Sequence, residues 1–244
     1  PCQGFSKNVT RSGRFLEDPK NLLVRSFMNA VEALSPRVVL MENVATMANA
    51  FGGAFRDELL QRFSDCGYAV RYGTHNAAEH GLPQRRNRVV FLASRVGLPK
   101  PLTRRARVPL RSGTHKANGI PAGAISVWDA IGDLGRVDPA GKADESNQYS
   151  CGPFSAFQEL MRVGHGVPVS DHTLRPLRSK QQARYDALEP GQGLPDLPPE
   201  LKTKGGYSGA YGRLTKTMIA PTITRWCFHP GSGRFGHPVE RRIL

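Results

Sequence analysis

The sequence predicts an α/β fold for its first part, because helical and strand patterns alternate over about ninety residues. Residues 20–35 carry apolar side chains at helical spacing, and Pro36 follows as a stop signal. Residues 37–44, RVVLMENV, form a nearly continuous apolar run, which is typical of a strand buried on both faces. This order favours an α/β layer with crossover connections. The apolar positions of the helix are Leu22, Leu23, Phe27, Ala30, Val31 and Leu34.

Three further segments continue the alternation. Residues 55–67, FRDELLQRFSDCG, are expected to form a helix that ends at Gly67, and Cys66 is expected to be a small buried hydrophobe. Residues 68–77 alternate like a strand, and residues 87–94, NRVVFLAS, have the composition of a second buried strand.

The composition changes near residue 97, after which Pro, Gly and Arg dominate. Residues 126–135 predict a short helix with a glycine stop, and residues 179–188 predict another. Residues 220–228, APTITRWCF, resemble a strand. We therefore expect a loop-rich, basic second region that depends on a partner surface.

Charge and cysteine usage limit the function classes. Lys and Arg number 34 against 20 acids, a net charge of +14 that is spread along the chain. This charge fits either a solvated basic surface or a polyanionic partner, and the residues alone leave both open. A membrane span is not expected, because no apolar run approaches the roughly 20 residues that it needs, and membrane binding is not expected, because no strongly amphipathic basic helix stands out. The four cysteines form no CxxC pair, so we expect no metal site. Their spacing and the missing secretory signal argue against disulfides, so we expect reduced thiols and a cytoplasmic location.

Three short stretches carry residue types suited to chemistry. PCQGFS places the Cys2 thiol in a turn, and MENV places Glu42 and Asn43 just past a buried strand. QRRNR places Arg86 and Arg88 two residues apart before another strand. Each stretch alone fits an ordinary loop cysteine, a strand-end acid or a solvated arginine cluster. A thiol, a carboxylate and a pair of arginines in this order form a pattern that is far more specific than any one of the three stretches.

These stretches resemble the motifs of DNA (cytosine-5) methyltransferases of the bacterial restriction–modification type. PCQGFS matches their Pro-Cys-Gln motif, MENV their Glu-Asn-Val motif and QRRNR their Gln-x-Arg-x-Arg motif. GRLTKTMIAPTITRW resembles the end of the target-recognition region, with Thr222 and Ile223 at the position of its Thr-Leu-type pair. SGRFGHPVERRIL resembles the approach to the next motif, which begins Arg-x-Leu-Thr. The likeness covers nearly the whole chain and implies a bacterial or phage-encoded protein.

The resemblance implies transfer of a methyl group from S-adenosylmethionine to C5 of a cytosine in a specific duplex DNA sequence. Cys2 would add to C6 of the base, which activates C5. Glu42 would hold the N3/N4 edge, Arg88 the O2 edge, and Arg86 would steady the site and the thiolate. The cytosine must leave the stacked duplex for this chemistry. The implied DNA-contacting residues are Gln3, Ser6, Asn43, Gln84, Thr222 and Ile223, with Asn43 also fixing the turn that bears Glu42.

The implied fold is the C-terminal part of a Rossmann-like S-adenosylmethionine-dependent methyltransferase sheet with a smaller, loop-rich target-recognition domain. Residues 1–96 would be a partial catalytic domain, 97–235 the recognition region, and 236–244 the start of the return to the catalytic domain. The Phe-x-Gly-x-Gly turn that binds the methyl donor has no counterpart here. Only Pro1 and Leu23 match cofactor contacts.

An incomplete sequence is therefore our leading expectation, with a split enzyme completed by a chain carrying the missing N-terminal half, or a degenerate remnant, as alternatives. Alone, the chain is expected neither to bind S-adenosylmethionine tightly nor to methylate DNA. Competing functions are a non-catalytic DNA-binding module and a methyltransferase acting on cytosine in transfer RNA. A thiol hydrolase is the weakest alternative, because no histidine lies in a recognisable partner motif.

Overall fold

A computed structural model describes most of the chain as two compact units. The first unit holds residues 23–76 and 86–97, and the second holds residues 77–85 together with the described residues from 123 onward. Pro1, Cys2, Gln3 and Ser6 lie outside the described residues. Within the described ranges, no helix is long and apolar enough to span a membrane. The described residues are 23–97, 123–137, 148–163, 169, 172, 174 and 176–244.

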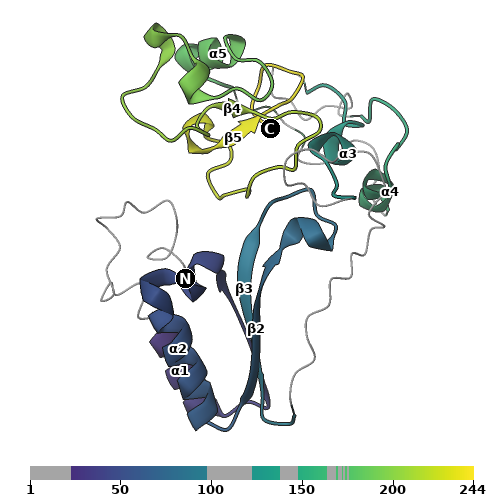
Figure 1. Cartoon of the computed structure of the whole chain (residues 1–244). Helices are drawn as coiled ribbons and strands as arrows, with labels where there is room; N and C mark the ends of the chain where they lie inside the picture. The colour runs from purple at the N-terminus through teal and green to yellow at the C-terminus, as the bar shows by residue number, and fades with distance from the viewer. Residues whose placement is uncertain are drawn as a thin grey trace. The chain divides into compact units, whose positions relative to one another are not determined.

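In the first unit, helices α1 (Leu23–Leu34) and α2 (Ala54–Asp65) pack together (Figure 1). Helix α1 ends before Pro36, as predicted, but the side that it buries is formed by Val24, Met28 and Val31. The expected apolar face was wrong in part, because Leu23 and Leu34 are exposed. The predicted helix end at Gly67 is confirmed just after α2, where φ is +76° and the glycine N–H donates to the Ser64 carbonyl at 2.9 Å.

The first unit contains a three-stranded sheet in the order β1-β3-β2. Its strands are β1 (Val38–Val44), β2 (Ala69–Asn76) and β3 (Asn87–Ser94). Strand β3 is antiparallel to both neighbours, so β1 and β2 run in the same direction. The predicted crossover through α2 therefore joins β1 and β2. The hydrogen-bonded strand pairs are nevertheless antiparallel, because β3 returns between β1 and β2.

The two faces of the sheet differ in burial. Val39 and Met41 of β1 are buried, whereas Val38 and Leu40 are 53% and 65% exposed. The predicted burial of this strand on both faces is thus wrong for the described residues. The physical reason is that α1 and α2 both pack on the face that carries Val39 and Met41.

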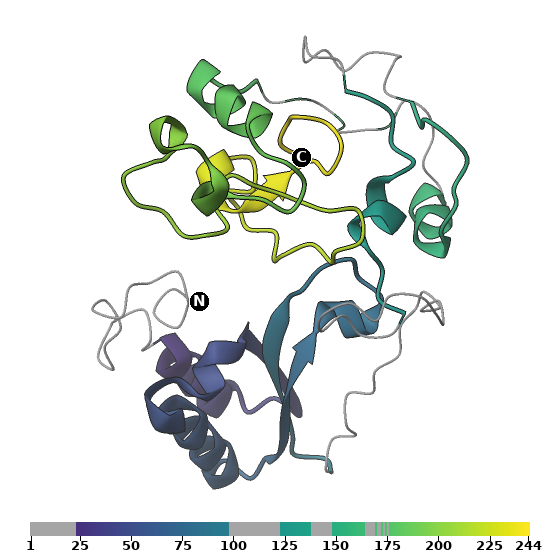
Figure 2. The same cartoon turned by 45° about the horizontal axis from the view of Figure 1, so that its top comes forward.

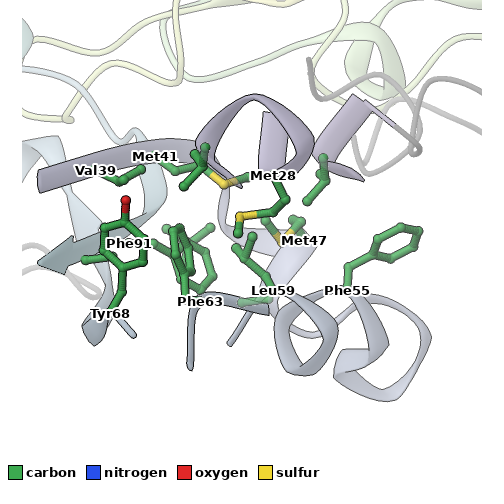
Figure 3. Packing of buried hydrophobic residues seen from close by; sticks show 14 residues of the cluster. Met28, Val39, Met41, Met47, Phe55, Leu59, Phe63, Tyr68 and Phe91 are labelled. Carbon is green, nitrogen blue, oxygen red and sulfur yellow. The ribbon is translucent and has the colours of Figure 1, made fainter. Parts of the chain in front are cut away.

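The core of the first unit lies between these helices and that face (Figure 3). Phe63, Phe91 and Val89 are fully buried there, and the Phe63 ring meets the Tyr68 ring edge-on at 5.7 Å between centroids. The Tyr68 hydroxyl donates to the Pro36 carbonyl at 2.6 Å, which ties the start of β2 to the turn before β1. Cys66 packs against the same cluster but is only half-buried. This core fixes the strands whose ends carry Glu42 and Arg88.

The second unit is rich in loops and turns, as Figure 2 shows. The helices expected at 126–135 and 179–188 are confirmed as α3 (Val127–Ile131) and α5 (Ser179–Asp186). The strand expected at 220–228 is wrong: only Ala220 forms a bridge, and turns follow. Pro221 has no N–H for a ladder, the Ile223 N–H donates to the Gln84 side chain, and the Cys227 N–H donates back to the Thr224 carbonyl. The other elements are η4 (Ala77–His80), α4 (Ala156–Arg162), η5 (Leu194–Asp196), η6 (Pro199–Leu201), β4 (Gly212–Arg213), η7 (Pro230–Ser232) and β5 (Arg234–Gly236); the first unit also holds η2 (Ala45–Ala48) and η3 (Ala50–Gly53).

Arg213 organises the interior of the second unit. It lies in β4, which pairs in parallel with β5, and it is 2% exposed. Its guanidinium donates to the carbonyls of Leu188, His237 and Val239 at 2.7, 3.2 and 3.0 Å. A fourth, longer bond at 3.4 Å reaches the Glu240 carbonyl. One side chain thus satisfies main-chain oxygens from two segments that have no regular structure of their own.

His237 lies in the same interior and is held neutral. Its Nδ1 accepts from the main-chain N–H groups of Val239 and Glu240 at 3.2 and 2.9 Å. Burial, with the nearby charge of Arg242, lowers the pKa of His237 to about 4. The free imidazole has a pKa near 6.5, so as pH is lowered His237 binds a proton at a higher pH in the unfolded chain than in the folded chain.

We therefore expect the free energy of unfolding of the second unit to fall in acid. The loss begins as pH drops below about 6.5 and reaches about 3 kcal/mol near pH 4. Both tryptophans, Trp128 and Trp226, lie in this unit, so urea unfolding at several pH values can be followed by indole fluorescence. His237→Asn should remove this part of the acid loss. His229→Asn, at an exposed histidine of the same unit, should retain it, and equal behaviour of the two variants would contradict the assignment.

Candidate active site

Glu42 and Arg88 meet at one end of the sheet of the first unit. The register pairs Val44 with Arg88 and Glu42 with Val90, so both functional side chains stand on the same face. Glu42 Oε1 and Arg88 Nε are 2.6 Å apart. Two residues far apart in sequence, both expected at the active site, are thus brought into direct contact by the pairing of β1 with β3.

This ion pair is accessible to a ligand. The side chain of Glu42 is 55% exposed and that of Arg88 is 20% exposed. A pair this open contributes at most about 1 kcal/mol, so the strand register and not the ion pair holds the two groups in place. A planar ligand that offers both donors and acceptors along one edge can therefore separate the two groups at low cost and bond to each.

Asn43 points to the other side of β1. It is 4% exposed, and its Oδ1 accepts from the N–H of the following residue, Val44, at 2.8 Å. The side chain of Asn43 therefore stabilises the end of the strand that carries Glu42. This geometry favours the supporting role over a direct DNA contact.

Arg86 lies just before β3, two residues ahead of Arg88. Its main-chain N–H donates to Asn76 Oδ1 at 3.2 Å, which fixes the approach to β3 against the end of β2. Arg86 is half-buried. Leu23, the expected cofactor contact among the described residues, begins α1 and is 41% exposed.

Three of the expected DNA-contacting residues meet in the second unit. Gln84 and Ala220 form a parallel bridge, and the Thr222 hydroxyl donates to the Arg85 carbonyl at 2.7 Å. The Ile223 N–H donates to Gln84 Oε1 at 3.4 Å. Gln84 thus positions the Thr222–Ile223 pair, although 139 positions separate Gln84 from Ile223 in the chain. The QRRNR motif therefore serves both units: Gln84 and Arg85 belong to the second, Arg86 and Arg88 to the first.

Sequence reasoning missed Trp226, which follows this pair. The residue is 53% exposed, and Ile223, three positions earlier, is 52% exposed. The segment was expected to be a strand, in which alternate side chains would be buried. The one available signal was a tryptophan next to an arginine in a segment rich in turn residues.

Comparisons with known proteins identify the family. The family model for the C-5 cytosine-specific DNA methylase matches residues 1–148. The chain is 28% identical over its whole length to the Type II methylase M.HgiDII of Herpetosiphon aurantiacus, and 30% identical over 88% of its length to the Type II methyltransferase M.DdeI of Desulfomicrobium norvegicum. It spans 60% and 50% of the lengths of these relatives.

A solved structure of an Escherichia coli prophage protein, described as a DNA modification methyltransferase, resembles the fold of the chain. The TM-score is 0.52 at 19% identity, and the match covers 100% of this chain and 63% of the other. At this identity the likeness concerns the mixed α/β fold alone. The match of the family model to residues 1–148, more than half of the sequence, shows that the chain belongs to the C-5 cytosine-specific DNA methylase family.

Proposed function

We propose that this chain carries the base-binding and nucleophilic part of an enzyme that methylates C5 of cytosine in duplex DNA. The observation that carries the proposal is the contact of Glu42 with Arg88 on an open face at the end of the sheet. The family and the two Type II relatives support the reaction class. We also propose that the two units correspond to a Rossmann-like catalytic part and a target-recognition part.

Cytosine matches this pair of side chains along its polar edge. The base presents O2 and N3 as acceptors and an amino group at C4 as a donor. Arg88 would donate to O2, and Glu42 would accept from the C4 amino group and share a proton with N3. The ion pair seen here opens when the base enters, and each of its members gains a bond to the ring in exchange.

Cys2 supplies the nucleophile. Its thiolate adds to C6, and the electron pair of the C5–C6 bond moves to the C5 side of the ring. The negative charge that results is shared by C5, N3 and O2, so the proton that Glu42 shares with N3 and the hydrogen bond from Arg88 to O2 would stabilise it. Arg86, two residues before Arg88, would favour the thiolate by its charge.

S-adenosylmethionine supplies the methyl group in this proposal. Leu23 is the one candidate contact among the described residues, and it is partly exposed. A single apolar side chain cannot form a binding site for a charged methyl donor. The proposal therefore rests on Cys2, Glu42 and Arg88, and its test must not depend on the donor.

Exchange of the hydrogen at C5 provides such a test. Addition of Cys2 to C6 lets C5 take a proton from water, and loss of the original hydrogen with expulsion of the thiolate restores cytosine. Random-sequence duplex DNA tritiated at C5 of cytosine should therefore release tritium to water when the 244-residue chain is added without any methyl donor.

Cys2→Ser should abolish the release while DNA binding persists. The matched control is Cys151→Ser, at an exposed free thiol, which should keep the wild-type rate. Release that survives in Cys2→Ser, or wild-type protein that binds DNA without any release, would overturn the proposal and favour a DNA-binding module. Faster release from tritiated transfer RNA than from DNA would indicate that transfer RNA, and not DNA, is the substrate.

A further inference from the structure

A loop of the second unit, residues 222–232, presents an aromatic side chain to solvent. Trp226 is 53% exposed, and the Phe228 ring supports it at 5.5 Å between centroids. The guanidinium of Arg225 lies 5.4 Å from the centre of the Trp226 ring, within the range of a cation–π contact. The ring is therefore backed by one neighbour, flanked by a charge, and still open over about half of its surface.

Hydrogen bonds within the loop hold this arrangement in place. The Cys227 N–H donates to the Thr224 carbonyl at 3.0 Å, and the His229 N–H donates to the Trp226 carbonyl at 2.8 Å. The Ser232 hydroxyl also donates to the Trp226 carbonyl. A ring on such a loop loses little conformational freedom when it binds a partner, so its exposed surface can yield affinity.

Two more large side chains are exposed on the same loop structure. Ile223 is 52% exposed, and Tyr207, at 53%, donates its hydroxyl to the Ser232 carbonyl. Trp226 and Tyr207 are thus both bonded to Ser232. Single exposed apolar residues are ordinary, but two exposed rings joined through Ser232, with Ile223 exposed on the same loop, indicate a contact surface.

The charge around the loop selects the kind of partner. Residues 201–244 contain eight Lys and Arg residues and one acid, Glu240. Arg85, whose carbonyl anchors Thr222, and Arg225 are both exposed, and no described carboxylate forms an ion pair with either. Exposed aromatic rings among unpaired arginines match nucleic acid, which offers flat bases between phosphates.

We propose that Trp226 stacks on a DNA base that has lost a stacking neighbour, while Arg225 and Arg85 bind the adjacent phosphates. The inference rests on the proposed function, because extrusion of a cytosine leaves the bases beside it, and its former partner, with uncovered faces. A sequence-independent ring contact of this kind would hold the opened duplex. The surrounding loops would remain free to read the sequence.

The two tryptophans of the chain allow a direct test. Trp128→Phe leaves Trp226 as the one indole, and Trp226→Phe leaves Trp128, whose ring is covered by Lys216 Nζ at 4.3 Å. Each protein is titrated with a duplex that has one abasic site, which leaves the opposite base poorly stacked, and with the intact duplex. Stacking should quench the Trp226 fluorescence, and more strongly with the abasic duplex, while Trp128 should respond little.

Binding constants for the abasic duplex complete the test. Trp226→Ala should weaken binding by about 5- to 150-fold, the range for loss of one stacked base, whereas Trp226→Phe should stay close to wild type. Phe154→Ala, at an exposed aromatic of the same unit, serves as the control and should bind normally.

Unchanged affinity in Trp226→Ala, or equal quenching by both duplexes, would overturn the inference. Self-association of the chain that Trp226→Ala abolishes, with DNA binding intact, would assign the surface to a second copy and also overturn it. The result is separable from the proposed function. Tritium release without quenching of Trp226 would contradict only the stacking proposal. Quenching of Trp226 without tritium release would contradict only the proposed methyltransferase chemistry.

Discussion

Glu42→Gln should lower the rate of tritium release from C5 of cytosine by about 10²- to 10⁴-fold, the usual contribution of a positioned acid–base group. The amide keeps the shape of the side chain and its place on β1, but it cannot share a proton with N3 as charge develops on the ring. Its charge is also lost beside Arg88, 2.6 Å away in the free protein. The release assay on duplex DNA measures this effect without a methyl donor.

A second ion pair in the same unit provides a matched control. Glu58 pairs with Arg25 at 2.7 Å between α2 and α1, both side chains are partly exposed, and the pair has no place in the proposed chemistry. Glu58→Gln should therefore leave the release rate within about twofold of wild type, since exposed pairs of this kind contribute about 1 kcal/mol or less to stability. Equal losses in Glu42→Gln and Glu58→Gln would show that Glu42 acts only through folding.

Arg88→Gln extends the same argument to the other edge of the base. If Glu42 and Arg88 grip one ring, the double variant should lose less activity than the product of the single losses, because each group depends on the base being held by the other. Independent, fully multiplicative losses would indicate that the two side chains do not act on the same ligand.

Local chemistry explains which parts of the fold could be predicted. Gly67 ends α2 because only a residue tolerant of positive φ fits there, and this requirement is visible in the sequence. Strand β3 was identified from its apolar run. The position of β3 between β1 and β2 was not predicted. Strand order depends on contacts between residues far apart in sequence, and the apolar run of β3 would look the same at the edge of the sheet as at its centre.

The burial of β1 shows a second limit. An apolar run predicts apolar surroundings, but it cannot say which helices supply them. Val39 and Met41 face α1 and α2, while Leu40 between them is 65% exposed. The run favoured a strand covered on both faces, and the partner that decides between one and two covered faces is not encoded locally.

The candidate site divides in the same way. Glu42, Arg86 and Arg88 were singled out because their motifs are short and ordered, and the register of β1 with β3 is what joins Glu42 to Arg88. The link from Gln84 to Ile223 spans 139 positions, and no periodicity reports it. Trp226 was missed because the segment was assigned to a strand, whereas Pro221 and local hydrogen bonds make it a loop.

Arg213→Met should lower the free energy of unfolding of the second unit by about 3 to 5 kcal/mol. Methionine fills much of the same volume but leaves the buried carbonyls of Leu188 and His237, and the partly buried carbonyl of Val239, without their donor. A buried polar group that loses its partner costs about 1 to 3 kcal/mol, and several are lost together here. Urea unfolding followed by the fluorescence of Trp128 and Trp226 reports on this unit directly.

The control for this change is Arg225→Met, at an exposed arginine in the same unit, which should shift stability by about 0.5 kcal/mol or less. Arg213→Lys separates charge from geometry: an ammonium keeps the charge but cannot reach carbonyls in several directions with a planar fork, so it should recover only part of the loss. Full recovery by lysine would mean that charge alone matters. A second unit that is stable without either side chain would show that the loops around β4 and β5 are held by their apolar contacts, such as those of Leu188 and Tyr211, and not by this arginine.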